Sequence, residues 1–479
     1  MTTENIQTYD VIVIGAGPVG ENVADRTSAA GLSTVIVESE LVGGECSYWA
    51  CEPSKALLRP ALMRADATHV PGIHPAVGNP LHVEAVLAHR DRMSAHWKDD
   101  GQVAWLKSAG IDLLRGHGRL TGEREVSVRT PSGDTVRLRA RHAVALSTGS
   151  RAALPPLAGI ENLRPWTSRE ATSASTPPGR LVVVGAGVVG VEMATAWQAL
   201  GSQVTLLART DGLLPRMEPF AGELVTERLR EAGADVRFGV SVVAAERAAD
   251  GEVRITLSDG GQLTADEILF ATGRAPRSEE IGLETVGLTP GDWIATDDSL
   301  TVTGVPGDWL YAAGDVNGRA LFTHQGKYQA RIAGAVIVAR AFGERLDTDR
   351  WSPHSATADG EAVPGVVFTD PEVASVGLTT IEAARTGRAV EVVDHDLARL
   401  AGALQYRPDY RGKARILIDP DRRVVVGATF AGPGVSELLY SATVAITAEV
   451  PVERLWHAVP AFPTISEVWL RMLETRRDS

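Results

Sequence analysis

The sequence predicts a mixed α/β protein, and three observations lead to that prediction. An apolar strand pattern, a glycine-rich turn and a helical pattern follow one another near the start of the chain. The same order recurs 170 residues later, and a region with a different mixture of strand and helix patterns begins at about residue 352. Short apolar strands that alternate with helices are typical of parallel sheets covered by helices. Because 479 residues are too many for one domain, we expect each glycine-rich copy to lie in its own domain.

The first copy has the complete pattern of a Rossmann-like unit. An apolar run at 9–14 predicts a buried strand, a GxGxxG turn follows it, and a second strand at 34–38 ends in Glu38. The glycines of the turn are Gly15, Gly17 and Gly20. In such a unit the glycines let the backbone approach a pyrophosphate at the helix N-terminus, and the terminal acid hydrogen-bonds a ribose hydroxyl. The pattern therefore predicts a dinucleotide site.

The second copy repeats the pattern with one difference. Strands are expected at 180–184 and 203–207, on either side of a second GxGxxG turn. The glycines of this turn are Gly185, Gly187 and Gly190. The position equivalent to the terminal acid is Ala208, with Arg209 beside it and Arg216 nearby. An acid there would repel a 2′-phosphate, so its absence beside two arginines favours NADPH over NADH; the alternative is that both arginines are merely solvated.

Cys46 and Cys51 are the only cysteines of the chain, and both lie in one short segment. Two close thiols in a large chain without a secretory signal indicate a redox pair, which we expect to close a disulfide across the first turn of a helix. The alternatives are two inert buried cysteines or a zinc site, but no Cys or His follows at ligand spacing, so no metal site is predicted. Two dinucleotide units and a thiol pair indicate electrons that pass from a nicotinamide through a flavin to sulfur, because a disulfide needs a mediator to accept a hydride.

With these motifs the chain resembles the class I pyridine nucleotide–disulfide oxidoreductases, a family that includes dihydrolipoamide dehydrogenase, glutathione reductase and mercuric reductase. The resemblance covers nearly the whole chain. It rests on both glycine-rich turns, on the segment 46–55 with its Cys-x4-Cys-x-Pro-Ser-Lys pattern, and on the segments 147–150, 271–274, 311–315 and 367–379. It implies an FAD-binding domain at 1–152 and 276–351, an NAD(P)-binding domain at 153–275 and a dimerisation domain at 352–479.

The C-terminal region agrees with the last of these domains. Strand patterns lie at 366–368, 414–418 and 424–428, and helical patterns lie at 435–447 and 466–475. In the family this α+β domain completes the active site of the partner, so the resemblance implies a homodimer.

The resemblance also implies roles for individual residues. Cys51 is expected to be the thiol next to the flavin, and Cys46 the interchange thiol that meets the substrate. Lys55 is expected near the flavin ring and paired with Glu192, where a cation favours the negative charge of reduced flavin; the alternative is that both are solvated surface charges. Asp315 is expected to hold the ribityl chain.

Further residues are assigned to the two cofactors on the same basis. The residues expected to bind FAD are Gly15, Gly17, Gly20, Glu38, Gly44, Lys55, Thr148, Gly149, Asp315 and Thr323, and those expected to bind the nicotinamide nucleotide are Gly185, Gly187, Gly190, Arg209, Arg216 and Gly273. Leu321 and His324 are also placed near the flavin ring, although His324 fits equally well as an ordinary residue at the start of a helix.

The chain departs from the family near its C-terminus. Members that exchange disulfides carry His-Pro-Thr-x-x-Glu, in which the His is the acid–base for the interchange thiol and the Glu orients it. Here Phe462 stands in place of the His, whereas Glu467 is kept. Phenylalanine carries no proton, so disulfide exchange should be weakened. His457 could replace the base only if the backbone departs from the family path.

The cysteine segment departs as well. Glu45 stands where Thr is usual, and Glu52 replaces an apolar residue. Two carboxylates beside the pair should oppose formation of the Cys46 thiolate. Tyr48 and Trp49 either shape the substrate side or only pack against neighbouring helices.

Composition excludes several classes of partner. The chain has 47 Lys plus Arg against 60 Asp plus Glu, a net charge of −13, which argues against nucleic acid and anionic membranes. No apolar run reaches transmembrane length and no targeting pattern is present, so a cytoplasmic location is expected.

The interpretation is an NADPH-dependent FAD oxidoreductase that reduces a small disulfide-type acceptor through Cys46 and Cys51. One alternative is a reductase of a quinone, a metal ion or another non-disulfide acceptor. Another is a flavoprotein subunit of a multienzyme complex. Phe462 weakens the case for lipoamide and glutathione, and the absence of a further C-terminal cysteine pair weakens the case for mercury.

Overall fold

The computed structural model describes residues 6–478, and tertiary contacts divide the chain into two compact units. Unit 1 extends to Glu52 and also contains Asp91–Arg151 and Arg274–Gly360, whereas unit 2 contains Pro53–Arg90, Ala152–Gly273 and the chain from Glu361 onward. This division places 53–90 in unit 2, whereas the sequence-based boundaries placed it in the FAD-binding domain. The three-domain boundaries themselves stay a prediction.

Unit 1 is built on a mostly parallel sheet of seven strands in the order β3-β2-β1-β6-β5-β4, with β16 paired to β6. The strands are β1 (Ile6–Ile14), β2 (Thr34–Glu38), β3 (Asp112–Arg115), β4 (His117–Gly122), β5 (Glu125–Arg129), β6 (Thr135–Leu146) and β16 (Leu310–Ala312). The predicted strand at 9–14 lies within β1 and the predicted strand at 34–38 is β2, so both predictions are confirmed.

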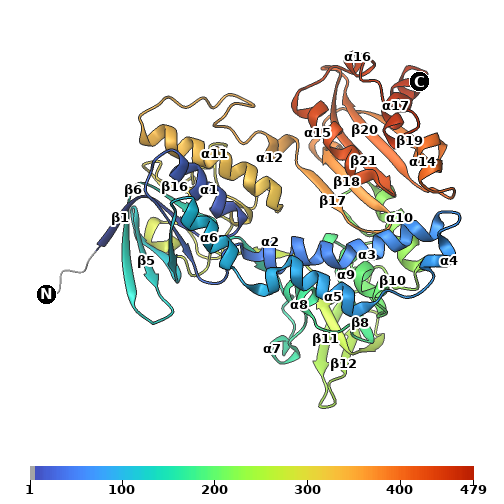
Figure 1. Cartoon of the computed structure of the whole chain (residues 1–479), viewed down its shortest axis with the longest axis horizontal. Helices are drawn as coiled ribbons and strands as arrows, with labels where there is room; N and C mark the ends of the chain where they lie inside the picture. The colour runs from blue at the N-terminus through green and yellow to red at the C-terminus, as the bar shows by residue number, and fades with distance from the viewer. Residues whose placement is uncertain (1–5, 479) are drawn as a thin grey trace. The chain divides into compact units, whose positions relative to one another are not determined.

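The central strand β1 is buried on both faces. Val11 and Val13 contribute to one apolar cluster, and Ile12 and Ile14 contribute to another. Alternate residues of a strand point to opposite faces, so a sheet covered on both sides needs an unbroken apolar run rather than an alternating one. On one face the long helices α1 (Pro18–Ala29) and α11 (Thr323–Ala341) pack side by side (Figure 1).

Helices complete unit 1. They are α1 (Pro18–Ala29), α2 (Gly44–Tyr48), η1 (Ala95–Trp97), α6 (Asp100–Ser108), η2 (Leu283–Val286), η3 (Asp315–Asn317) and α11 (Thr323–Ala341). The helices α3 (Cys51–His69), α5 (Val83–Met93) and α12 (Ala358–Glu361) cross the division between the units, and β7 (Ser150–Ala152) pairs with β15 (Arg274–Pro276) where the chain passes between them.

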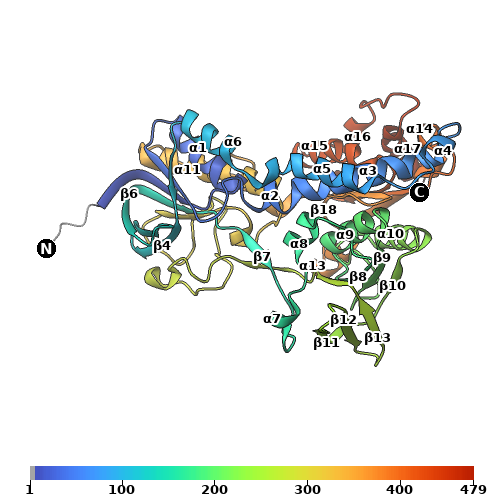
Figure 2. The same ribbon diagram turned by 60° about the horizontal axis from the view of Figure 1, so that its bottom comes forward.

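The second glycine-rich turn lies in unit 2, on a four-stranded parallel sheet of order β10-β9-β8-β14 (Figure 2). Its elements are α4 (His74–Val77), α7 (Ile160–Leu163), α8 (Ser168–Ser173), β8 (Arg180–Val184), α9 (Val188–Ala199), β9 (Gln203–Leu207), α10 (Pro219–Glu231), β10 (Asp235–Arg237) and β14 (Glu267–Phe270). An antiparallel sheet of β11 (Val242–Arg247), β12 (Val253–Leu257) and β13 (Gln262–Ala265) is attached to it. The strands predicted at 180–184 and 203–207 are confirmed.

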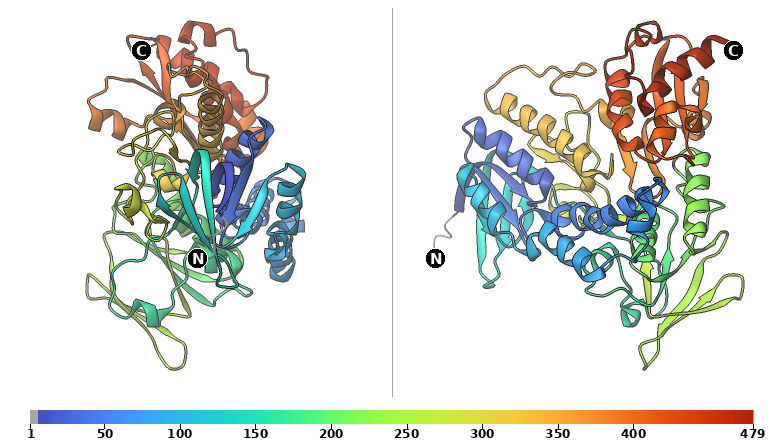
Figure 3. Two further views of the ribbon diagram at one scale, coloured as in Figure 1. Left: turned by 90° about the vertical axis from the view of Figure 1, so that its left-hand side faces the viewer. Right: turned by 45° about the vertical axis from the view of Figure 1, so that its right-hand side comes forward.

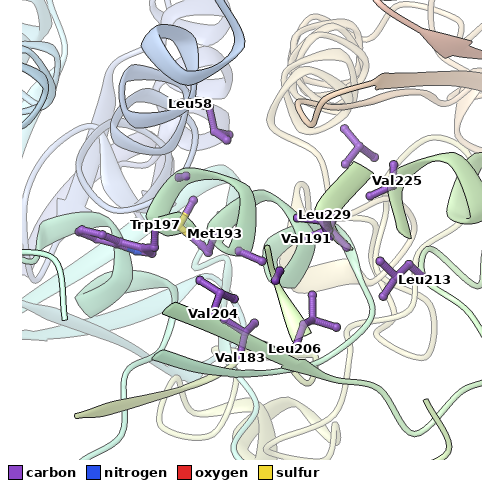
Figure 4. Close-up of a cluster of buried hydrophobic side chains, with 14 of the residues drawn as sticks. Leu58, Val183, Val191, Met193, Trp197, Val204, Leu206, Leu213, Val225 and Leu229 are labelled. Carbon is purple, nitrogen blue, oxygen red and sulfur yellow. The ribbon is translucent and has the colours of Figure 1, made fainter. Parts of the chain in front are cut away.

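A single apolar cluster explains why residues 53–90 belong to unit 2. Leu57 and Leu58 of α3 are fully buried, and they share this cluster with Met193 and Trp197 of α9 (Figure 4). Burial of a Leu side chain contributes about 1.5–3 kcal/mol, so the packing of these two leucines is strong enough to hold the segment in unit 2. The packing partner of α3 lies far away in the sequence.

The C-terminal part of unit 2 is an antiparallel sheet of order β17-β18-β21-β20-β19 with helices packed against it (Figure 3). Its elements are β17 (Pro364–Val367), β18 (Glu372–Gly377), α13 (Thr380–Thr386), β19 (Glu391–Asp396), η4 (Leu397–Arg399), α14 (Ala401–Tyr406), β20 (Lys413–Asp419), β21 (Val424–Gly432), η5 (Val435–Leu438), α15 (Leu439–Thr447), α16 (Val452–Leu455), η6 (Ile465–Glu467) and α17 (Val468–Asp478). The predicted α/β class with a C-terminal α+β domain is confirmed.

Among the helices of the described residues, none combines the length and the apolar character that crossing a membrane requires.

Glu218 should be a main source of stability within unit 2. Its buried carboxylate accepts hydrogen bonds from the Thr380 amide, the Thr380 hydroxyl and Arg415 Nη1, each at 2.7 Å. Glu218→Ala leaves these donors without an acceptor, so we expect a loss of about 3 kcal/mol and a Tm lower by roughly 5–10 °C in thermal unfolding. Glu223→Ala removes an exposed carboxylate from α10, the helix that Glu218 precedes as its N-cap residue, and serves as the control. Equal Tm values for the two variants would contradict the assignment.

Candidate functional site

The first glycine-rich turn brings the start of α1 against the end of β1. Gly15 has φ +100°, and a Cβ on it would lie 2.4 Å from the Ser147 carbonyl oxygen. A Cβ on Gly20 would lie 1.9 Å from the Gly15 carbonyl oxygen. Only glycine fits either position. Gly17 caps α1 and Pro18 occupies its first turn, which leaves the free N–H groups of the helix at the turn.

A second glycine pair meets this turn. Gly43 and Gly44 both have positive φ, and a Cβ on Gly44 would lie 2.8 Å from Gly17 Cα. Glu38 Oε2 accepts a hydrogen bond from the Ala16 amide at 2.7 Å, so the terminal acid of β2 also holds the turn in place. The structure thus brings together the two glycine segments and Glu38, all of which were expected at the FAD site.

The loop after β16 presents Asp315 within the same unit. The Ser150 hydroxyl donates to Asp315 Oδ2 at 2.5 Å, and Arg274 Nε donates to the Ser150 hydroxyl at 2.7 Å. Burial raises the pKa of Asp315 above its ordinary value. The Gly314 amide is held by Gln329 Oε1 at 2.7 Å. Asp315 is therefore oriented by a chain of side-chain hydrogen bonds rather than left as a mobile surface acid.

These residues fit an FAD molecule. The glycine segments leave backbone surface that no side chain could occupy, and such a turn at a helix N-terminus suits a pyrophosphate. The Ser147 hydroxyl is buried, and within residues 6–478 it has no hydrogen-bond partner. A ligand at the turn would supply one. Thr148 is fixed nearby by a hydrogen bond from its hydroxyl to the Arg277 carbonyl oxygen at 2.7 Å.

The two cysteines lie close together but in different helices. Cys46 belongs to α2, whereas Cys51 is the first residue of α3. The expectation that both span the first turn of one helix was wrong, because the backbone of Trp49 leaves the helical region with φ −138°. Both residues are present as thiols, and Cys51 Sγ lies 3.4 Å from the Thr323 hydroxyl at the start of α11. The structure therefore places Thr323 beside the thiol pair.

The environment of Cys46 disfavours its thiolate. The hydrogen bond with Cys51 is the largest cause that raises the pKa of Cys46, followed by burial, and the charge of Glu52 acts in the same direction. The expected effect of flanking carboxylates is thus present for Glu52. Glu45 instead forms an ion pair with Arg277 at 3.3 Å.

Lys55 and Glu192 form an ion pair in unit 2, as expected. Lys55 Nζ lies 2.7 Å from Glu192 Oε2, and Glu192 is 3% exposed, so the alternative of two solvated charges was wrong. Glu192 Oε1 accepts a hydrogen bond from the Phe368 amide at 3.0 Å, and Lys55 Nζ lies 5.1 Å from the centre of the Phe368 ring. The pair therefore connects α3, α9 and the segment after β17.

The second glycine-rich turn repeats the geometry of the first. A Cβ on Gly185 would lie 2.3 Å from the Ala271 carbonyl oxygen, and a Cβ on Gly190 would lie 2.1 Å from the Gly185 carbonyl oxygen. Gly187 caps α9, and Gly273 has φ +139°.

The two arginines expected to recognise a 2′-phosphate lie just beyond β9. Arg209 and Arg216 are exposed, and no ion pair of either side chain occurs within the described part of the chain. Ala208 is buried beside them. The guanidinium groups are thus not used to hold the fold, which suits groups that bind a ligand anion.

The C-terminal motif contains the acid Glu467, but Phe462 stands at the position of the family's basic His. Phe462 is 74% exposed, whereas Glu467 is buried in η6. Glu467 Oε1 accepts from Arg471 Nη2 at 2.5 Å, but Glu467 Oε2 has no hydrogen-bond partner among residues 6–478. His457 is an exposed residue after α16.

Sequence reasoning missed Ser150, Arg274 and Arg277 as individual site residues. Ser150 and Arg274 lay inside motifs that carry the family resemblance, but their contact with Asp315 depends on segments far apart in the chain. Arg277 had a usable signal. An unusual acid at Glu45 next to a predicted pyrophosphate site calls for a compensating cation.

Known families match the chain over most of its length. The family described as pyridine nucleotide-disulphide oxidoreductase matches residues 9–336, and its dimerisation domain matches residues 363–473. Dihydrolipoyl dehydrogenase 3 of Pseudomonas aeruginosa is 32% identical over 469 residues, with 96% of each chain covered. Dihydrolipoyl dehydrogenase of Chlorobaculum tepidum is 32% identical over 463 residues, with 96% of this chain and 95% of the relative covered.

Two solved structures share the fold. The Cu(II) complex of the HOCl-induced flavoprotein disulfide reductase RclA from Escherichia coli has a TM-score of 0.82 at 22% identity, with 98% of this chain and 99% of that chain covered. LpdA of Mycobacterium tuberculosis has a TM-score of 0.82 at 24% identity, with 99% of this chain and 100% of that chain covered.

The reactivity of Cys46 should depend on Cys51. Because Cys51 is the main cause of the raised pKa of Cys46, Cys51→Ser should lower that pKa and increase the Cys46 thiolate near pH 8. We expect alkylation of Cys46 by iodoacetamide to become roughly tenfold faster, measured by mass spectrometry after reduction. Cys46→Ser is the matched control, and in this variant the rate of Cys51 alkylation is measured instead. An unchanged rate for Cys46 would show that burial alone sets its reactivity.

Proposed function

Because this chain belongs to the pyridine nucleotide-disulphide oxidoreductase family, whose members are FAD-dependent enzymes, we propose that it is an NADPH-dependent reductase that delivers electrons through Cys46 and Cys51 to a small disulfide-type acceptor. The observation that carries the proposal is the thiol pair itself. Cys46 and Cys51 hydrogen-bond to each other and to Thr323, in the same unit as the first glycine-rich turn. A homodimer is supported by the match to the dimerisation domain.

FAD, when bound, supplies two-electron transfer between the nicotinamide and sulfur. The chain's own residues then perform the thiol chemistry. The Cys46 thiolate attacks one sulfur of the acceptor disulfide, so that one thiolate leaves and a mixed disulfide forms. The Cys51 thiolate attacks Cys46 Sγ, releases the second thiolate and closes the Cys46–Cys51 disulfide. The acceptor gains two electrons and two protons, and the cysteine pair is oxidised by the same two electrons.

Proton transfer from Cys46 is the step of this route that the described residues assist least. The pKa of Cys46 is raised, and Phe462 offers no base to assist it. Both facts favour a second candidate, reduction of a non-disulfide acceptor such as a quinone or a metal ion. RclA, solved as a Cu(II) complex, shares only the fold at 22% identity, so Cu(II) enters as one acceptor to test.

The names of the sequence relatives support a third candidate. Several are dihydrolipoyl dehydrogenases at about the same length as this chain, so a role as the flavoprotein subunit of a multienzyme complex is tested with lipoamide. The proposed setting is the cytoplasm, where thiols are kept reduced.

A single acceptor screen separates these candidates. The purified protein is supplied with NADPH and with lipoamide, glutathione disulfide, a quinone or Cu(II), and NADPH loss is followed by absorbance. Reduction of a disulfide should be abolished in Cys46→Ser, because Cys46 must attack the acceptor. Reduction of a quinone at the flavin should survive that substitution. A protein that binds no FAD, or that oxidises NADPH with none of these acceptors, contradicts the proposal.

Nucleotide preference should depend on Arg209. Its guanidinium is proposed to pair with the 2′-phosphate of NADPH, so Arg209→Glu introduces repulsion at that point. We expect the NADPH-to-NADH ratio of flavin reduction rates, measured by stopped-flow at subsaturating nucleotide, to fall on the order of tenfold or to reverse. Arg254→Glu reverses a charge on β12 of the same domain and should leave the ratio unchanged. If the ratio is unaltered in Arg209→Glu, this residue does not recognise the phosphate.

Restoring the base at position 462 should restore disulfide exchange. General acid–base assistance contributes about 10²–10⁴-fold, so Phe462→His should raise lipoamide or glutathione disulfide turnover by roughly tenfold or more. Glu467 Oε2 lacks a partner within the described residues and is available to orient the new imidazole.

Two further variants control this experiment. Phe462→Leu keeps an apolar residue and should give no gain, and adding Glu467→Gln to Phe462→His should remove most of the gain. Brisk lipoamide turnover by the unmodified protein would show that another group supplies the proton, with His457 as the first residue to test. No gain in Phe462→His would favour the non-disulfide acceptors.

A further inference from the structure

Glu21 is a buried carboxylic acid that none of the roles above uses. It directly follows the last glycine of the first glycine-rich turn and lies in the first turn of α1. Only 9% of its surface is exposed, and its Oε1 is buried without a hydrogen-bond partner among residues 6–478. A buried polar atom without a hydrogen-bond partner destabilises the folded protein, and an ionised one does so more strongly. The position is therefore incomplete until a proton or a ligand satisfies it.

Burial, more than the surrounding charges, disfavours the ionised form of Glu21. Burial is the largest cause that raises the pKa of Glu21 to about 7, and Glu38 at the end of β2 adds to it. Lys327 of α11 acts in the opposite direction. Burial and the charge of Asp99 are the larger causes that raise the pKa of Tyr48 in α2 to about 12, and the charge of Glu21 adds to them. Glu21 thus changes its protonation state close to neutral pH.

The ligand expected at this turn adds negative charge. A pyrophosphate at the N-terminus of α1 would share the turn with Glu38, and Lys327 is the cation that acts on Glu21. An ionised Glu21 would then be repelled by the phosphates as well as by Glu38. A neutral Glu21 would not be repelled, and its O–H group could donate a hydrogen bond to an acceptor oxygen of the ligand.

We propose that Glu21 is a cofactor-binding residue that holds FAD as a neutral carboxylic acid, so that FAD binding takes up one proton from solution onto Glu21. The inference rests on the proposed function, because it requires that the first glycine-rich turn binds FAD. The only covalent bond that forms is the O–H bond of Glu21, and its proton comes from the buffer.

The proposal predicts a specific pH dependence. Below about pH 6, Glu21 is protonated in both the free and the FAD-bound protein, and affinity does not change with pH. Between the pKa of the free protein and the higher pKa of the complex, each pH unit weakens FAD binding by up to about tenfold. Glu21→Gln keeps a neutral hydrogen-bond donor, so its affinity should not depend on pH.

The test uses the full-length protein after removal of FAD. FAD is titrated back at about pH 6.5 and 8.5 with flavin fluorescence as the readout, and by calorimetry in two buffers of different ionisation enthalpy, which counts the protons taken up. For the unmodified protein we expect uptake that approaches one proton at about pH 8.5 and is smaller at about pH 6.5, and a Kd at least fivefold higher at the upper pH. Glu21→Gln should show no uptake and equal Kd values. Asp25→Asn, on the same helix, should behave like the unmodified protein.

Asp315 is the rival acceptor of the proton that is taken up, because burial also raises its pKa. Loss of uptake in Asp315→Asn, with uptake retained in Glu21→Gln, would overturn the proposal. So would tight FAD binding by the unmodified protein with no proton uptake, a measurement that does not depend on the folding of any variant. Failure to bind FAD at every pH would instead contradict the proposed function.

Discussion

The contact between the backbone of Gly15 and that of Gly20 is the constraint on which the rest of unit 1 depends. A Cβ on Gly20 would lie 1.9 Å from the Gly15 carbonyl oxygen, so β1 and α1 can meet only if this position has no side chain. That contact sets the N-terminus of α1 at the carboxyl end of β1. Glu38 and the Gly43–Gly44 pair are held against the same turn, and the expected cofactor site follows from their meeting. The second turn, in unit 2, obeys the same constraint at Gly185 and Gly190.

Several acidic residues of unit 1 lie around a site that is expected to bind an anionic cofactor. Their negative charges are offset in different ways. Glu45 is balanced by the Arg277 guanidinium, and Asp315 is held by a hydroxyl that Arg274 orients. Glu21 has no comparable partner in the described residues for its buried oxygen, and burial raises its pKa to about 7, close to physiological pH. Protonation, rather than ion pairing, is the compensation that remains for it. Cofactor binding and proton binding are therefore linked through the same group of side chains.

The thiol pair and the C-terminal motif point toward the same chemical consequence. The pKa of Cys46 is raised by Cys51, by burial and by Glu52, while Phe462 provides no proton acceptor to offset the effect. An enzyme of this family with both features is poorly suited to fast disulfide exchange at neutral pH. The Lys55–Glu192 pair, in which Glu192 is buried, is fully formed in contrast, and Glu192 also accepts a hydrogen bond from the Phe368 amide. The chain thus retains an ion pair expected near the flavin while it lacks the acid–base group of disulfide exchange.

The sequence by itself determined the strands beside both glycine-rich turns, the turns themselves and the family, because these follow from local apolar patterns, from backbone conformations that only glycine allows and from motifs. It also identified Cys46 and Cys51 as a redox pair from their place in one short segment, and the family resemblance implied the Lys55–Glu192 pair. Only the tertiary structure decided that Cys46 and Cys51 lie in different helices, that Thr323 lies beside Cys51 across 272 residues of sequence, and that α3 packs with unit 2. The partners of Asp315 and Glu45, and the unsatisfied oxygen of Glu21, emerged in the same way. Such contacts join residues far apart in the chain, and they depend on how whole elements pack, which no local pattern encodes.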